Sequence, residues 1–65
     1  MTYSEYIARC RRGSWKELAR EGQYAFNMLY TYRPDLGNQI LKTDLDPYYS
    51  DKRLPEFYTW VEKNW

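Results

Sequence analysis

The start of the chain carries apolar side chains at the spacing of one helix face, i, i+3, i+4 and i+7: Tyr3, Tyr6, Ile7 and Cys10. Such spacing is typical of an amphipathic α-helix. Thr2 is followed three residues later by Glu5, the pattern of a capping box in which two residues satisfy each other's backbone N–H groups. Glycine commonly follows the end of a helix, and Gly13 occupies that place. The pattern therefore predicts a helix that begins at Thr2 or Tyr3 and ends at Gly13.

The middle of the chain is predicted to hold a short helix and then a longer one. Ser14 and Glu17 repeat the capping pattern, which predicts a second helix that runs to Glu21. Gly22 either ends this helix or is tolerated inside a longer one at about 1 kcal/mol relative to alanine, and we favour a break near Glu21 and Gly22. No breaker interrupts residues 23–32, whose apolar side chains cover two faces: Ala25, Phe26, Met28, Leu29, Tyr30 and Tyr32. We expect this central helix to be buried on two sides.

Proline marks two predicted helix starts in the second half of the chain. Arg33 precedes Pro34, and a residue before proline is displaced from the α conformation, so the central helix should end there and Pro34 should open the next. The apolar residues of that helix are Leu36, Ile40 and Leu41. The last helix is expected to start around Leu54 and Pro55, with Pro55 at the first helical position. Its apolar spacing is formed by Leu54, Phe57, Tyr58, Val61 and Trp65. Because no β alternation of useful length appears, the predicted class is all-α, a single bundle of four or five short helices.

Turn-forming residues and acids fill the segment between these helices, residues 43–51, which we expect to be an ordered loop. Its acids Asp44, Asp46 and Asp51 are of the type that binds hard cations. A calcium loop needs glycine at its sixth position, however, and the sixth position counted from Asp44 is Tyr49. We therefore expect Asp44 or Asp46 to cap the turn at Pro47 and Asp51 to cap the last helix, and we predict neither a metal site nor a cofactor.

Length, composition and charge limit the number of domains, the partners and the location we expect for this protein. With 65 residues and 8.0 kDa the chain is expected to form one domain, residues 1–65, and a 20% share of aromatic residues argues against disorder. Ten basic and nine acidic side chains leave a net charge of +1, too little for a field that attracts nucleic acid or an anionic membrane. No basic and apolar leader opens the sequence, and its longest apolar run is three residues, 28–30. We expect a cytoplasmic protein.

Few residues are suited to catalysis. The chain has no histidine, the commonest general base, and its single cysteine, Cys10, lies on an apolar helix face where a buried thiol is expected. Asp44 and Asp46 form a carboxylate pair, but acid and base roles require a concave, partly desolvated pocket that so small a domain scarcely accommodates. We predict that the protein is not an enzyme.

Five stretches of the second half form a recognisable pattern: GQYAFNMLY at 22–30, RPDL at 33–36, TDLDPYY at 43–49, RLPEF at 53–57, and the ending WV…W at 60–65. The pattern resembles very short proteins encoded in bacteriophage genomes. The resemblance covers residues 22–65 and implies a viral origin. It carries no activity and no binding site with it.

Two binding hypotheses follow from the side chains that a small core leaves over. Tyrosine and tryptophan dominate binding hot spots, and the aromatic residues we expect to form a protein-binding face are Tyr48, Tyr49, Tyr58 and Trp60. The partner would be a host protein, inhibited or redirected by steric occlusion, or a second copy of the chain. An alternative is that these aromatic residues are scattered, or thinly cover the core.

The second hypothesis is nucleic-acid binding. Residues 1–33 carry six basic against three acidic side chains, and residues 34–65 carry four against six, so positive charge gathers in the first half. The candidate phosphate-binding and stacking residues are Arg9, Arg11, Arg12, Trp15, Lys16 and Arg20. Basic residues near a helix C-terminus also stabilise the helix, which is the simpler explanation for Arg11 and Arg12.

Overall fold

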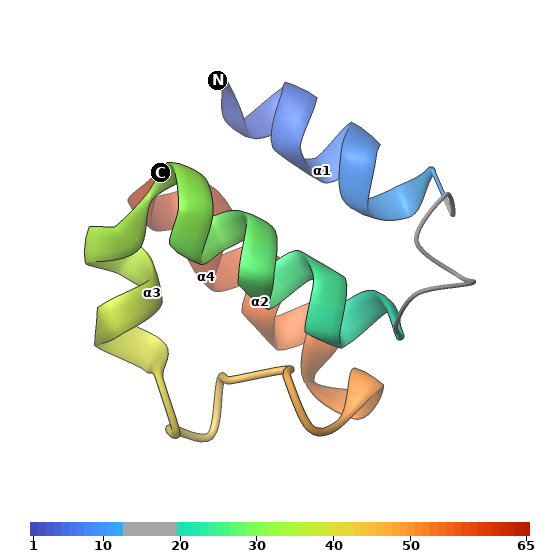
Figure 1. Cartoon of the computed structure of the whole chain (residues 1–65), viewed down its shortest axis with the longest axis vertical. Coiled ribbons are helices and arrows are strands. Elements are labelled where there is room, and N and C mark those ends of the chain that lie inside the picture. The colour runs from blue at the N-terminus through green and yellow to red at the C-terminus, as the bar shows by residue number, and fades with distance from the viewer. Residues whose placement is uncertain (13–19) are drawn as a thin grey trace.

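The computed structural model describes residues 1–12 and 20–65. Within them lie four α-helices, α1 (Tyr3–Arg11), α2 (Glu21–Tyr32), α3 (Pro34–Ile40) and α4 (Leu54–Asn64), and one 3₁₀ turn, η1 (Asp51–Arg53). The described residues contain no strand, so the predicted all-α class is confirmed (Figure 1). Gly13, where the first helix was expected to end, and residues 14–19 of the helix expected between Ser14 and Glu21 lie outside the described residues, and Arg20 has an extended backbone.

The helix starts that rest on short-range signals are confirmed. Thr2 caps α1 through the complete capping box with Glu5, whose carboxylate accepts the Thr2 backbone N–H at 3.0 Å. Pro34 is the first residue of α3, as expected, and α4 begins at Leu54, so Pro55 is its second residue rather than its first. Each of these signals acts within four residues, which explains why the sequence alone locates them.

The start of α2 differs slightly from expectation. The helix begins at Glu21 rather than at residue 23, so Gly22 lies inside its first turn. A Cβ on Gly22 would come within 2.3 Å of the Pro47 carbonyl oxygen and 2.7 Å of Asp51 Oδ1. Gly22 therefore permits the return loop to approach the helix backbone rather than ending a helix.

Asp51 caps a different helix from the one expected. Its Oδ1 accepts the backbone N–H of Gly22 at 2.9 Å and pairs with the Arg20 guanidinium at 2.9 Å, so it caps α2 from 29 residues further along the chain. The prediction that Asp51 caps the last helix was wrong. The carboxylate instead compensates the unpaired N–H groups and positive end of α2, which has no cap of its own from Arg20.

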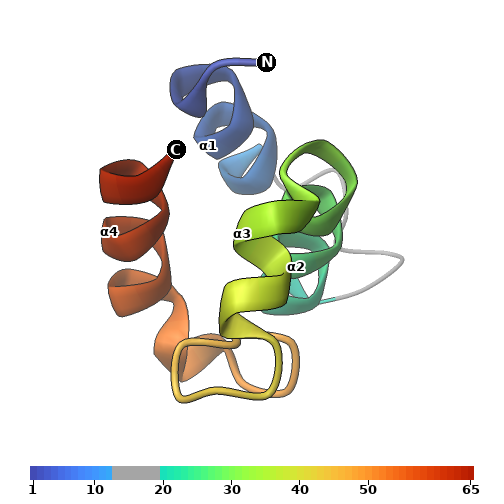
Figure 2. The ribbon, with the colours of Figure 1, turned by 90° about the vertical axis from the view of Figure 1, so that its left-hand side faces the viewer.

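The helices pack around one small core. In Figure 2, α4 stands on one side and the α2–α3 pair on the other, with α1 across one end and the loop of residues 41–50 across the opposite end. Core residues with 3% or less of their surface exposed form its centre: Tyr6, Cys10, Ala25, Leu29, Leu36, Ile40, Phe57 and Val61. Pro47, in the loop of residues 41–50, is also fully buried. Leu41, expected on the apolar face of α3, is 44% exposed because α3 ends at Ile40 and the chain turns there.

Trp65 joins the two ends of the described chain. Its ring lies 5.1 Å from the Tyr6 ring and 6.3 Å from the Tyr3 ring, measured between centroids, and its indole N–H donates to the Met1 carbonyl at 3.2 Å. The Arg33 guanidinium lies over the same indole, 5.5 Å from its centroid, and donates to the Trp65 carbonyl. Residues 1 and 65 are therefore neighbours in space, as Figure 1 shows.

Candidate functional site

A small hollow opens where the 41–50 loop returns to α2. It has a volume of about 140 Å³ and is lined by Phe26 from α2 and, beyond α3, by Leu41, Lys42, Asp46, Tyr48 and Tyr49. Three of the six lining residues are aromatic and one is aliphatic. The hollow is thus an apolar depression with a cation, Lys42, among its lining residues.

Aromatic rings continue from this hollow along α2. The centroids of Tyr30 and Phe26 are 6.0 Å apart, those of Phe26 and Tyr48 are 6.1 Å apart, and those of Tyr48 and Tyr49 are 4.9 Å apart. The last two pairs meet edge to face, the geometry that aromatic rings favour. We call Tyr30, Phe26, Tyr48 and Tyr49 the aromatic row.

The row passes from the core to the solvent. Phe26 is buried, Tyr48 is half-buried, Tyr30 is 40% exposed and Tyr49 is 79% exposed. With Leu41 at 44%, these side chains are among the most exposed large apolar residues of the described chain. The surface beside the loop therefore offers apolar area that the fold itself leaves uncovered.

Hydrogen bonds hold the loop under this surface in place. Asp46 is buried, and its two carboxylate oxygens accept the backbone N–H groups of Lys42 and Tyr48, each at 2.9 Å. This confirms an aspartate cap at the Pro47 turn. Gln23 donates to the Tyr48 hydroxyl at 3.1 Å, and the Arg20 guanidinium donates to the Tyr48 carbonyl. Tyr49 therefore directly follows a backbone segment that these hydrogen bonds hold in place.

The structure divides the four aromatic residues that were expected to share a face. Tyr48 and Tyr49 line the hollow, whereas Trp60 is half-buried and lines a separate groove on α4; the two depressions share no lining residue. Tyr58 is only 6% exposed, so its expected place on the surface was wrong.

Tyr58 lies in the core because all three of the longer helices meet around it. Its hydroxyl donates to Glu21 Oε2 on α2 at 2.7 Å, and the Arg11 guanidinium of α1 lies 5.4 Å from its ring centroid. Burial, and then the bond to Glu21, raise the pKa of Tyr58 above its ordinary value. Its hydroxyl stays neutral and its role is to hold α1, α2 and α4 together.

The described members of the basic set engage different elements. Arg9 donates to the Tyr32 hydroxyl at the end of α2 at 3.4 Å, Arg11 faces Tyr58 on α4, and Arg20 pairs with Asp51 and the Tyr48 carbonyl. Arg12, which is exposed, caps the C-terminus of α1. Trp15 and Lys16 lie outside the described residues. The described arginines thus support the fold at three separate places.

The remaining residues of chemical interest are the single cysteine and the potential metal ligands. Cys10 is fully buried, and burial raises the pKa of its thiol to about 11, so the thiolate is scarce at neutral pH. Within residues 1–12 and 20–65, no group of three or more potential metal-ligating side chains comes together. No helix in these two ranges is long and apolar enough to cross a membrane.

Sequence reasoning missed four residues of this surface: Phe26, Tyr30, Leu41 and Lys42. Phe26 and Tyr30 were expected to bury the second face of α2, and Leu41 to lie on the buried face of α3. What brings them together is the return of the 41–50 loop onto α2, a contact between residues 15 to 23 positions apart, for which the sequence carries no local signal.

Comparison with known proteins adds no family. No family model matches the chain, and neither a curated protein nor a solved structure shows significant similarity to it.

Proposed function

We propose that this chain is a small, non-catalytic protein-binding module of bacteriophage origin that acts in the host cytoplasm. It inhibits or redirects a host protein by covering part of that protein's surface. The observation that supports this proposal is the exposed aromatic row beside a hollow, with Tyr49 at 79% exposure on a loop held by Asp46.

The chemistry of the row is that of a binding hot spot. Tyrosine rings provide large contact area at little cost in side-chain entropy, and a pre-organised loop lowers the entropy lost on binding. The hollow of about 140 Å³ is of a size for one apolar side chain, and Lys42 at its edge favours a carboxylate next to that side chain. Both Asp46 oxygens already accept backbone N–H groups, so they are occupied within the loop.

The dimensions of the molecule suit occlusion. Its principal extents are 28 × 24 × 19 Å, and one such face can cover the roughly 800 Å² that each partner buries in a protein complex of standard size. A module of this kind needs no catalytic group, because covering a partner's own binding site is enough to block it.

The test is a comparison of matched tyrosine variants. A tagged chain is used to capture partners from a bacterial lysate, with and without nuclease, at low and high salt, and any captured protein is then purified and its affinity measured. Tyr49→Ala should weaken binding by about 30-fold, the size of a hot-spot loss. Tyr32→Ala is the control, because Tyr32 is 43% exposed but lies outside the aromatic row.

Each outcome decides the proposal. A partner that is lost with Tyr49→Ala and kept with Tyr32→Ala supports it. A partner that binds both variants equally well contradicts it. Recovery of nucleic acid alone, lost at high salt, would also contradict it and would transfer the function to the basic residues of the first half, Arg9, Arg11, Arg12, Trp15, Lys16 and Arg20.

A further inference from the structure

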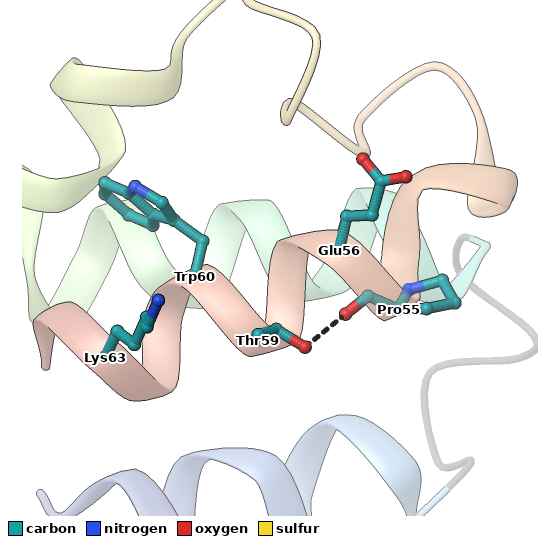
Figure 3. A pocket seen from close by; sticks show the side chains of 5 residues that line it. All are labelled: Pro55, Glu56, Thr59, Trp60 and Lys63. Atoms are coloured by element: carbon teal, nitrogen blue, oxygen red, sulfur yellow. Dashed lines mark hydrogen bonds between the residues drawn. The ribbon is translucent and has the colours of Figure 1, made fainter.

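The outer face of α4 carries a depression larger than the hollow. This α4 groove has a volume of about 400 Å³ and is lined by Pro55, Glu56, Thr59, Trp60 and Lys63. In Figure 3 these side chains follow one another along the helix, with Pro55 and Glu56 near its first turn and Lys63 near its last. The core-facing residues of the same helix, Leu54, Phe57, Tyr58 and Val61, point the other way.

The middle of the groove is apolar. The Thr59 hydroxyl donates to the Pro55 carbonyl at 3.0 Å, a bond drawn in Figure 3, so its polar atom is satisfied within the helix. The Trp60 carbonyl accepts the Asn64 side-chain N–H at 2.8 Å. What the middle of the groove offers a partner is therefore the Thr59 methyl group and the half-buried Trp60 ring.

The two ends of the groove carry opposite charges at symmetric positions. Glu56 and Lys63 are exposed, and each lies three and a half residues from the midpoint between Thr59 and Trp60. They are seven residues apart, which is two helical turns or about 10.5 Å, so they share one face. Neither forms an ion pair with another residue of the described ranges, where the pairs are Arg20–Asp51, Arg33–Asp35 and Arg53–Asp44.

This arrangement is complementary to itself. If a second α4 lies antiparallel across a twofold axis through the midpoint, Glu56 of each chain meets Lys63 of the other, and the Thr59 and Trp60 side chains meet at the centre. A twofold contact uses the same patch on both chains, so each interaction occurs twice. A parallel arrangement would instead place like charges together, which is unfavourable.

We propose that the α4 groove is the contact surface of a homodimer in which two α4 helices pack antiparallel. The area is modest: α4 has 11 residues and is about 16 Å long, so the contact falls below the 1,200 Å² typical of stable complexes. The dimer is accordingly weak and forms at high local concentration.

Reversing the charges of Glu56 and Lys63 tests the proposal. Dimerisation is measured by sedimentation equilibrium at low salt, at chain concentrations from about 10 μM to 1 mM. Glu56→Lys places a lysine opposite Lys63 of the second chain at both ends and should weaken dimerisation at least tenfold. Lys63→Glu should do the same with two carboxylates. An equimolar mixture of the two single variants should form a heterodimer, because every contact then joins opposite charges, and the double variant E56K/K63E should dimerise like the original chain.

Glu62→Lys is the matched control, since it makes the same change of charge on an exposed residue of α4 outside the groove. Circular dichroism of each variant verifies that the helices remain folded. A chain that stays monomeric at 1 mM overturns the proposal. So does a dimer that Glu56→Lys leaves unchanged, or one that the mixture of variants fails to restore.

The α4 contact is independent of the proposed host-protein binding. The groove shares no residue with the hollow, so Tyr49→Ala should leave dimerisation unchanged while it weakens host-protein binding. A dimer abolished by Tyr49→Ala would show that the copies meet through the aromatic row instead, and would overturn the α4 contact.

Discussion

Tyrosine is used in two opposite ways within this molecule. Tyr6 is fully buried and its hydroxyl donates to the Ala25 carbonyl at 2.6 Å, and Tyr58 is also buried, with its hydroxyl donating to Glu21. Tyr49 and Tyr30 leave much of their rings in solvent, and the Tyr30 hydroxyl donates to Asn38 on the surface at 2.7 Å. The difference teaches that aromatic content alone does not locate an interface. What distinguishes the two groups is whether the helices enclose the ring, as they do for Tyr6 and Tyr58, or leave it at the surface.

The largest contrast should come from removing one ring of each kind. Tyr6→Ala removes a buried ring that touches Trp65 and links α1 to α2, and should lower the free energy of unfolding by about 3–5 kcal/mol, enough to unfold a domain of this size. Tyr49→Ala should cost less than about 0.5 kcal/mol. Urea unfolding followed by circular dichroism measures both. Equal losses would show that the aromatic row belongs to the core.

Two glycines allow the same comparison through the backbone. Gly22→Ala places a Cβ 2.3 Å from the Pro47 carbonyl, which is backbone and cannot move aside alone, so the loop must shift at a cost of about 2–3 kcal/mol. Gly37→Ala places a Cβ 2.7 Å from the Tyr30 ring and 3.2 Å from the Tyr30 Cα, a less severe approach to backbone than at Gly22, so a smaller loss of about 1–2 kcal/mol is expected. Thermal unfolding of the two variants ranks them. The reverse order would mean that the loop adapts more easily than the ring.

Alkaline pH should destabilise the fold through its buried tyrosines and cysteine. Burial raises the folded-state pKa values of Tyr6, Tyr58 and Cys10 above those of the unfolded chain. Above about pH 9 the unfolded chain therefore loses protons that the folded chain keeps, so the stability present at neutral pH falls as pH rises, by up to about 1.4 kcal/mol per unit for each group. Melting temperatures between pH 7 and 11 measure the slope. Tyr58→Phe should reduce it, and an unchanged slope would exclude Tyr58 as a source.

Removing only the hydroxyl gives the smallest expected effect. Tyr6→Phe deletes a buried hydrogen bond and should cost about 1 kcal/mol, whereas Tyr30→Phe deletes an exposed one and should cost a few tenths. Urea midpoints resolve this difference when the m-values agree. If Tyr30→Phe proved the more costly, the bond to Asn38 would be a structural link between α2 and α3.

Features that rest on neighbouring residues could be predicted from the sequence. The capping box of Thr2 and Glu5, the helix starts at the two prolines and the apolar spacing of α4 all act within a few residues or a few turns. The structure places them as expected, because local hydrogen bonds and helix periodicity do not depend on the rest of the fold.

Features that depend on contacts between residues far apart in the sequence could not be predicted. Asp51 caps α2 across 29 residues, and Tyr58 becomes buried only because α1 and α2 both reach it. The candidate site was predicted in part: Tyr48 and Tyr49 do lie at a hollow, but the residues from α2 and the end of α3 that complete it are brought there by the tertiary fold. Periodicity shows which helix face is apolar, and not which loop will cover it.

The hydrogen bond between the Trp65 indole and the Met1 carbonyl holds residues 1 and 65 close together. A short peptide linker between residues 1 and 65 would close the backbone into a ring with little change to the folded chain. Its effect would fall on the unfolded chain, which would lose conformational entropy, as it does when a disulfide closes a long loop. In Figure 1 the loop of residues 41–50, which carries Tyr49, lies at the opposite end of the molecule from residues 1 and 65, so a circularised chain would still present Tyr49.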